Sequence, residues 1–193
     1  GYAPVIVRGP LKPGNVIING EDSQPVSAIL IASALVPGIT KIHVKNPGEK
    51  PWVNLTLDWF KRLGISFTNK DFIHYTVNGI TCYEGFNYKV PGDFSSALFP
   101  IVAAIIKKSS ITLTNIDMDD VQGDKAVISI LQDMGTNISN DKTQNLLHIS
   151  KGQEIKAINI NVNDFIDSIT ILAVLGCYAK DTSHITGAAI AQN

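Results

Sequence analysis

The sequence is poor in the residues that mark several specialised classes of protein. Its 193 residues include 2 cysteines and 7% aromatic residues, and the formal net charge is −1. Cys82 and Cys177 stand far apart without a CxxC motif, so neither a disulfide framework nor a zinc site is indicated, and reduced thiols are expected. A balanced charge without clustered lysine and arginine gives no electrostatic footprint for nucleic acid. We therefore expect no metal, no nucleic-acid partner and a cytoplasmic location.

Long apolar runs are also missing. The longest, at 99–106 and 169–179, are shorter than the roughly 18 residues needed to span a bilayer. No membrane segment is expected. The 45% of hydrophobic residues is still enough to build a substantial core in a chain of this length.

What the sequence does contain is a long internal repeat. A short cluster of acidic and small polar residues stands between an extended run and an apolar helical run at 20–23, 92–95 and 163–168, at intervals of about 72 residues. A second helical pattern recurs at nearly the same interval, at 57–64 and 128–135. Repeats of this length indicate stacked structural units, each of which buries its hydrophobic face against its neighbours.

Each repeat predicts six elements in the order βαβαββ. Asp22 or Ser23 is expected to cap the first helix, while Pro51 suits the first turn of the second helix and Gly64 ends it. The apolar stripe expected on that second helix comprises Trp52, Leu55, Trp59, Phe60 and Leu63.

The fold class expected from this pattern is α/β, with two full βαβαββ units and part of a third. Residues 5–8 resemble the last strand of an earlier copy, so we expect the chain to be part of a longer protein. The predicted strands are 15–18, 40–44, 65–68, 72–77, 87–90, 110–114, 136–139, 145–149, 158–162 and 183–186, and the predicted helices are 23–36, 51–63, 95–107, 121–134 and 165–179.

The starts of the first helices are the expected place for chemistry. Free backbone N–H groups and the positive end of the helix dipole recur there, and such ends attract anions. If the helices are parallel, their starts converge and suit a small, multiply charged ligand. The alternative is that the Ser, Asp and Gly residues are ordinary capping residues.

Five motifs carry a resemblance to a known family. They are Asp-Ser-Gln-Pro-Val-Ser-Ala at 22–28, Glu-Lys-Pro-Trp at 49–52, Gly-Asp-Phe-Ser-Ser at 92–96, Val-Gln-Gly-Asp at 121–124 and Phe-Ile-Asp-Ser at 165–168. In order and spacing, over the whole chain, the sequence resembles the central segment of bacterial-type 5-enolpyruvylshikimate-3-phosphate (EPSP) synthases.

The resemblance implies the inside-out α/β barrel fold of enolpyruvyl transferases, with two lobes of three βαβαββ units and an active site between them. Residues 1–91 would be the last unit of one lobe, and residues 92–193 the first unit and part of the second unit of the other. The family transfers the enolpyruvyl group of phosphoenolpyruvate to the 5-hydroxyl of shikimate 3-phosphate and releases phosphate, in the shikimate pathway to chorismate and the aromatic amino acids. No cofactor is implied, and the full-length protein would be a monomer. Without the remaining segments of the polypeptide, we expect the chain to be inactive.

The resemblance also implies roles for individual residues. Asp167 occupies the position of the catalytic aspartate, and Ser23 and Gln24 match residues that hold shikimate 3-phosphate. Trp52 stands where a tyrosine usually lies near the shikimate ring. The alternatives are a helix-stabilising acid for Asp167, capping and solvated positions for Ser23 and Gln24, and a core position for Trp52.

Two residues depart from the family pattern. Asp22 and Glu49 stand where phosphate-binding serines are usual, although both fall in the substrate-binding segments. A carboxylate about 4 Å from a phosphate costs roughly 1 kcal/mol in water and about 4 kcal/mol near a protein surface. We expect both to pair with Lys50 or with arginines elsewhere in the full-length protein; the alternatives are that the carboxylates turn outward or that the acceptor differs.

Further expectations complete the assignment. Gly92, Asp93, Ser95 and Ser96 are expected to be structural, as are residues 122–124, and Asp164 is expected to cap the last helix. The alternative functions are a UDP-N-acetylglucosamine enolpyruvyl transferase and a non-catalytic lobe of the same fold. The four histidines are expected on strands rather than in a metal site; they are His43, His74, His148 and His184.

Overall fold

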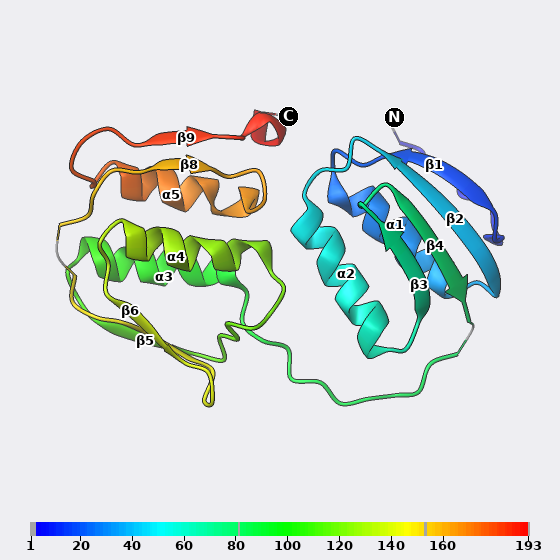
Figure 1. Cartoon of the computed structure of the whole chain (residues 1–193), viewed down its shortest axis with the longest axis horizontal. Helices are drawn as coiled ribbons and strands as arrows, with labels where there is room; N and C mark the ends of the chain where they lie inside the picture. The colour runs from blue at the N-terminus through cyan, green and yellow to red at the C-terminus, as the bar shows by residue number, and fades with distance from the viewer. Residues whose placement is uncertain (1–2, 81, 153, 193) are drawn as a thin grey trace. The chain divides into compact units, whose positions relative to one another are not determined.

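The computed structural model describes residues 3–80, 82–152 and 154–192 (Figure 1). The chain divides by its internal contacts into two compact units. Unit 1 comprises Gly1–Pro47 and Thr56–Gly85, and unit 2 comprises Gly48–Leu55 and Phe86–Asn193. Both units combine helices and strands, which confirms the expected α/β class.

The first repeat has the predicted βαβαββ order. Its sheet has the strand order β1-β2-β4-β3, in which β1 and β2 are parallel and the other pairs are antiparallel. The elements are β1 (Asn15–Asn19), α1 (Ser23–Ala34), β2 (Gly38–Lys45), α2 (Lys50–Arg62), β3 (Ser66–Lys70) and β4 (His74–Gly79).

Helix α1 packs on this sheet because apolar side chains alternate along the strands. Val26 and Leu30 of α1 are buried, as are Ile42 of β2 and Val77 of β4. Gly79 allows the end of α1 to approach β4, since a Cβ there would lie 2.2 Å from the carbonyl oxygen of Ser33. The helix therefore covers one face of the sheet, and its start at Asp22 is held at one end of that layer.

Unit 2 contains the second repeat and the described part of the third. In Figure 1 helices α3, α4 and α5 lie between the sheet that holds β5 and β6 and the β8–β9 pair. Strands β5, β7 and β6 form an antiparallel sheet, while β8 and β9 are parallel. The elements are α3 (Phe94–Ile106), β5 (Ile111–Thr114), the 3₁₀ turn η1 (Gly123–Lys125), α4 (Ala126–Asp133), β6 (Ile138–Asp141), β7 (Leu146–Ile149), β8 (Asn159–Asn161), the 3₁₀ turn η2 (Ile166–Ser168), α5 (Ile169–Gly176), β9 (His184–Thr186) and the 3₁₀ turn η3 (Ala189–Gln192).

A single hydrophobic core holds unit 2 together. Phe94 and Leu98 of α3, Leu131 of α4, Leu147 of β7 and Leu175 of α5 all have 0% exposure. Because all three helices contribute to one cluster, their starts are also held in a defined arrangement within the unit.

Two predicted strands are wrong. Residues 5–8 and 87–90 have no strand assignment, and Val5, Ile6 and Val7 are 78–88% exposed. A strand needs a neighbour to take its backbone hydrogen bonds and to cover its apolar face, and neither stretch pairs with another described strand. Near the second stretch, Asn115 donates from Nδ2 to the carbonyl oxygen of Val90 (2.9 Å).

Several predicted boundaries are also corrected. The helices expected at 121–134 and 165–179 begin as the 3₁₀ turns η1 and η2, and their α-helical parts end at Asp133 and Gly176. Strand β6 starts two residues later than predicted, because Thr136 still closes the preceding helix: its Oγ1 donates to the carbonyl oxygen of Leu131 (2.7 Å).

The stripe predicted for α2 is only partly right. Trp52, Leu55, Trp59 and Leu63 are half-buried, while the buried apolar side chains are Val53, Leu57 and Phe60.

Candidate functional site

The start of α1 carries Asp22, Ser23 and Gln24 in unit 1. Asp22 is the N-cap, and its Oδ1 accepts a hydrogen bond from the backbone N–H of Gln24 (2.8 Å). Ser23 is 5% exposed, and the Gln24 side chain is exposed. The Asp22 carboxylate thus occupies the helix start at which an anion would otherwise bind.

The start of α2 carries Glu49 and Trp52, which both belong to unit 2. Glu49 is 8% exposed and has a positive φ of 43°, a conformation that is uncommon outside glycine. Its carbonyl oxygen accepts a hydrogen bond from the N–H of Trp52 (3.1 Å), whose side chain is half-buried. Backbone strain of this kind clusters at binding sites and costs about 1–3 kcal/mol.

Asp167 lies inside the turn η2, directly before α5, with its side chain exposed. Phe165 and Ser168 are the residues that precede η2 and α5, and neither makes a side-chain cap. The expected cap, Asp164, instead accepts a hydrogen bond at Oδ1 from Nδ2 of its neighbour Asn163 (3.0 Å), so that prediction is wrong.

The electrostatic surroundings of Asp167 favour its protonated form. Although its side chain reaches solvent, partial desolvation raises the pKa of Asp167, and the nearby carboxylates of Glu49 and Asp93 raise it further. The structure thus brings together, within unit 2, one predicted catalytic residue and one predicted substrate-binding residue. Asp22, Ser23 and Gln24 belong to unit 1.

Asp93 behaves differently from Asp167. It is the N-cap of α3, where its Oδ2 accepts from the N–H of Ser96 (2.8 Å) and from Oγ of Ser95 (2.7 Å). Burial opposes its ionisation, but these hydrogen bonds to the carboxylate outweigh it and lower the pKa of Asp93. Asp93 is therefore a stable anion with a capping role, which confirms the structural role expected for it.

Asp124 is the residue whose importance the sequence did not reveal. Its side chain is fully buried in unit 2, and its Oδ1 accepts a hydrogen bond from Oγ of Ser168, while Oδ2 has no hydrogen-bond partner. Burial raises the pKa of Asp124; the bond from Ser168 opposes the rise, and the charges of Asp167 and Asp93 add to it. The one sequence signal for the proximity of Asp124 and Asp167 is the repeat, because it predicts that the starts of the helices lie close together.

Gln122 and Gly123 connect the starts of α3, α4 and α5. Gln122 accepts at Oε1 from the N–H of Phe94 (2.9 Å) and donates from Nε2 to the carbonyl oxygen of Gly92 (3.1 Å). Gly123 packs so closely that a Cβ there would lie 2.3 Å from the carbonyl oxygen of Asp164. The structural role expected for Gln122 and Gly123 is confirmed.

The arrangement can support proton transfer. Neighbouring carboxyl groups have pKa values that are shifted in opposite directions, downward for Asp93 and upward for Asp124 and Asp167. Of the two raised groups, only Asp167 reaches solvent and can touch a ligand. Asp167 is therefore the group in unit 2 placed to exchange a proton with a substrate.

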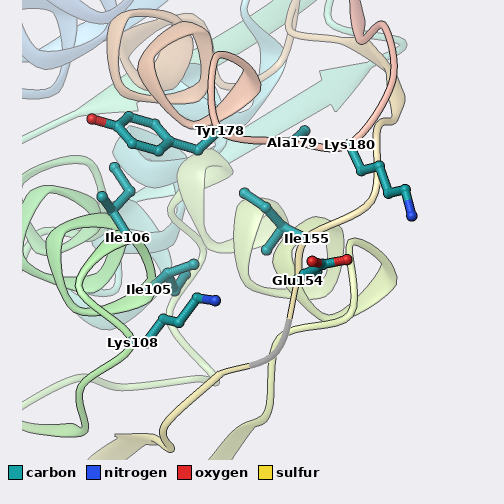
Figure 2. Close-up of a pocket in the computed structure, with 8 residues that line it drawn as sticks. All are labelled: Ile105, Ile106, Lys108, Glu154, Ile155, Tyr178, Ala179 and Lys180. Carbon is teal, nitrogen blue, oxygen red and sulfur yellow. The ribbon is translucent and has the colours of Figure 1, made fainter.

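A cavity of about 400 Å³ lies elsewhere in unit 2 (Figure 2). It is lined by residues at the C-terminal ends of α3 and α5, such as Ile105 and Tyr178, together with Ile155. Asp93 and Asp167 precede the other ends of the same two helices, so the cavity is separate from the candidate site. Of its two lysines, Lys108 lies two residues beyond the end of α3, where a cation complements a helix C-terminus.

Within residues 3–80, 82–152 and 154–192, no group of three or more His, Cys, Asp or Glu side chains could hold a metal ion. None of the helices in these ranges has the length and apolar character needed to cross a bilayer. The four histidines lie on β2, β4, β7 and β9, as predicted.

Comparisons with known proteins agree with this picture. A family model described as EPSP synthase (3-phosphoshikimate 1-carboxyvinyltransferase) matches residues 1–193. The 3-phosphoshikimate 1-carboxyvinyltransferase of Acetivibrio thermocellus is 42% identical over 185 residues, which cover 96% of this chain and 43% of the relative. The enzyme of the same name from Chlamydia trachomatis serovar L2 is 40% identical over 187 residues, which cover 96% of this chain and 42% of the relative. The chain thus spans less than half the length of these relatives.

Solved structures share the fold. An EPSP synthase from Acinetobacter baumannii matches with a TM-score of 0.72 and 24% identity, covering 93% of this chain and 41% of that chain. The enolpyruvyl transferase NikO from Streptomyces tendae matches with a TM-score of 0.71 and 16% identity, and the match covers 90% of this chain and 44% of that chain. The expected enolpyruvyl transferase fold is confirmed.

Proposed function

Because the chain belongs to the EPSP synthase family, we propose that it forms the central part of an enzyme that transfers the enolpyruvyl group of phosphoenolpyruvate to the 5-hydroxyl of shikimate 3-phosphate and releases phosphate. The observation that carries the proposal is the placement of Asp167, an exposed carboxyl with a raised pKa, beside the anionic side chains of Glu49 and Asp93. A raised pKa brings a carboxylate closer to the value at which it works as a general base near neutral pH.

The proposed chemistry assigns Asp167 to the acceptor hydroxyl. Its carboxylate takes the proton of the 5-hydroxyl as the hydroxyl oxygen forms a bond to C2 of phosphoenolpyruvate, while C3 accepts a proton from an acidic group of the full-length protein. In the second step a base removes a proton from C3, the C2–C3 double bond forms again and the C2–O bond to phosphate breaks, which releases phosphate. Both substrates are anionic, so the charge of Asp167 has to be balanced by cations from the remaining segments of the full-length protein.

Substrate binding is assigned to the starts of α1 and α2. Ser23 and Gln24 offer hydroxyl and amide groups to shikimate 3-phosphate, and Trp52 offers a half-buried ring beside it. Asp22 and Glu49 belong to the same segments. The hydrogen bond from the Gln24 N–H to Asp22 supports a model in which this carboxylate turns back onto α1 instead of facing the phosphate.

The arrangement in lobes is part of the proposal. Residues 1–91 would form the last repeat of one lobe, and residues 92–193 would open the other. The complete βαβαββ order of residues 15–79 and the change of unit between Gly85 and Phe86 support this division. We place the enzyme in the cytoplasm, because Cys82 and Cys177 are free and exposed. A monomeric full-length protein is proposed from the family resemblance.

The test uses the full-length protein with phosphoenolpyruvate and one acceptor at a time, while phosphate release is followed. Release with shikimate 3-phosphate is expected. Release only with UDP-N-acetylglucosamine, or with neither acceptor, would refute the proposal. Asp167→Asn should lower kcat by about 10²–10⁴-fold. Asp133→Asn, which changes an exposed carboxylate at the end of α4, is the matched control and should keep full activity.

A further inference from the structure

The proposed chemistry leaves one fully buried carboxyl without a role. Asp124 has 0% exposure, and only one of its two oxygens has a hydrogen-bond partner. A buried polar group that lacks a partner costs about 1–3 kcal/mol. An apolar residue of similar size would avoid that cost, so stability alone does not account for an acid at this position.

The side-chain partner of Asp124 is the neighbour of the candidate catalytic residue. Ser168 follows Asp167 in the chain, is fully buried, and donates its hydroxyl hydrogen bond to Asp124. Its backbone N–H bonds to the carbonyl oxygen of Phe165 (3.1 Å), which closes the turn around Asp167. One side of the turn is thus attached to Asp124 through a side chain.

The neighbour of Asp124 supports the same turn at a second point. The backbone of Gly123 lies against the carbonyl oxygen of Asp164, at the beginning of the turn. The segment 123–124 therefore touches residues on both sides of Asp167, while the Asp167 side chain itself remains exposed to solvent. This geometry lets the turn be rigid while its carboxylate stays accessible.

We propose that Asp124 is a positioning residue for Asp167: by holding Ser168 from the buried side, it keeps the 164–168 turn in the conformation that presents the Asp167 carboxylate. The link to catalysis rests on the proposed function, whereas the ordering of the turn does not.

The charged groups around Asp124 are consistent with a neutral side chain in this role. Asp167 and Asp93 are the anions that raise its pKa together with burial, and no cation is among the causes. A protonated carboxyl still accepts the Ser168 hydrogen bond, and it adds no second charge beside Asp167. An asparagine has the same shape and the same acceptor, so it should replace Asp124 in function.

The kinetic test compares three variants of the full-length enzyme. Asp124→Ala should lower kcat about 10–100-fold and leave KM within about threefold, because a shift of about 1 Å in a reacting group is enough for such a loss. Asp124→Asn should stay within about threefold of the wild type. Asp119→Ala removes an exposed carboxylate that pairs with Lys142 and should change neither constant. A wild-type kcat in Asp124→Ala, or an equal loss in Asp124→Asn, would overturn the proposal.

Ser168→Ala removes the other partner of the contact, so it tests the proposal even if Asp124→Ala folds poorly: its kcat should fall about 10–100-fold, and a wild-type kcat would overturn the proposal. Residues that act through one contact give non-additive effects, so the double variant should be no slower than the slower single variant. Multiplied losses would show that the two residues act independently and would overturn the proposal.

Amide hydrogen exchange separates this inference from the proposed function. In Asp124→Ala, the amide exchange rates of residues 165–169 should rise at least about tenfold. In Asp124→Asn, these rates should equal those of the wild type. If exchange follows this pattern but the wild type lacks the proposed activity, only the proposed function fails. Unchanged exchange in Asp124→Ala would overturn the positioning role, whatever the activity.

Discussion

Replacing Gly123 with alanine should displace the turn that carries Asp167. A Cβ at this position would lie 2.3 Å from the carbonyl oxygen of Asp164, and ordinary van der Waals contact begins at 3.4 Å. The two backbones must therefore separate by about 1 Å, since the obstacle is a main-chain oxygen instead of a flexible side chain. Alanine is otherwise a good residue in a helical turn, so the contact decides the outcome.

Two magnitudes follow from that displacement. Overpacking of this kind costs typically about 1–3 kcal/mol in the free energy of unfolding. A misplacement of about 1 Å in a catalytic group costs about 10²-fold in rate. Because Asp164 opens the turn, we expect kcat of the full-length enzyme to fall about 100-fold while the protein remains folded.

The assay measures kcat and the thermal midpoint of Gly123→Ala beside Gly152→Ala. Gly152 is a matched control, because a Cβ there would meet nothing within 4 Å. The control should match the wild type in both measurements. If Gly123→Ala also has wild-type kcat, the turn can move away from Gly123 without displacing Asp167, and the reasoning about its support is refuted.

Three further predictions concern stability. Phe94→Ala removes a fully buried ring from the core of unit 2 and should lower the free energy of unfolding by about 3–5 kcal/mol in urea titrations; a loss below 1 kcal/mol would contradict the packing described. Asp22→Ala removes the N-cap of α1 and should cost about 0.5–2 kcal/mol, whereas Asp22→Asn should keep most of that stability. Burial raises the pKa of Tyr75 to about 12, so the stability linked to its neutral form is present below pH 10 and is lost as pH rises towards 12. Thermal midpoints between pH 10 and 12 should therefore fall less in Tyr75→Phe than in the wild type, and equal slopes would contradict the assignment.

The acidic residues at the equivalent helix starts of the repeat have different roles. Asp22 and Asp93 cap α1 and α3 through the backbone N–H groups of Gln24 and Ser96. Asp167 lies inside η2 instead, where its carboxylate remains exposed. The type of helix start therefore distinguishes their roles: the acids at α-helical starts are caps, and the acid in the 3₁₀ start is the candidate catalytic residue.

The repeat explains which parts of the fold were predictable. Spacing and hydrophobic periodicity are local properties, so they located α1, α3 and the strands that pair within one repeat. They failed for 87–90 and 5–8, because a strand also depends on a partner that local sequence does not specify. Asp164 failed as a cap for a related reason: the helix begins as a 3₁₀ turn whose N-cap is Phe165, and the Asp164 carboxylate accepts a hydrogen bond from Asn163 instead.

The sequence by itself determined the α/β class and the recurring helix starts, since these depend on residue type and interval, while the resemblance of its motif to the EPSP synthase family singled out Asp167 as the acid to examine. Only the tertiary structure decided that Asp124 is buried against Ser168 and that Glu49 and Asp93 act on Asp167. The physical reason is that pKa values and hydrogen-bond partners depend on distances between residues far apart in the chain, and these distances exist only after packing.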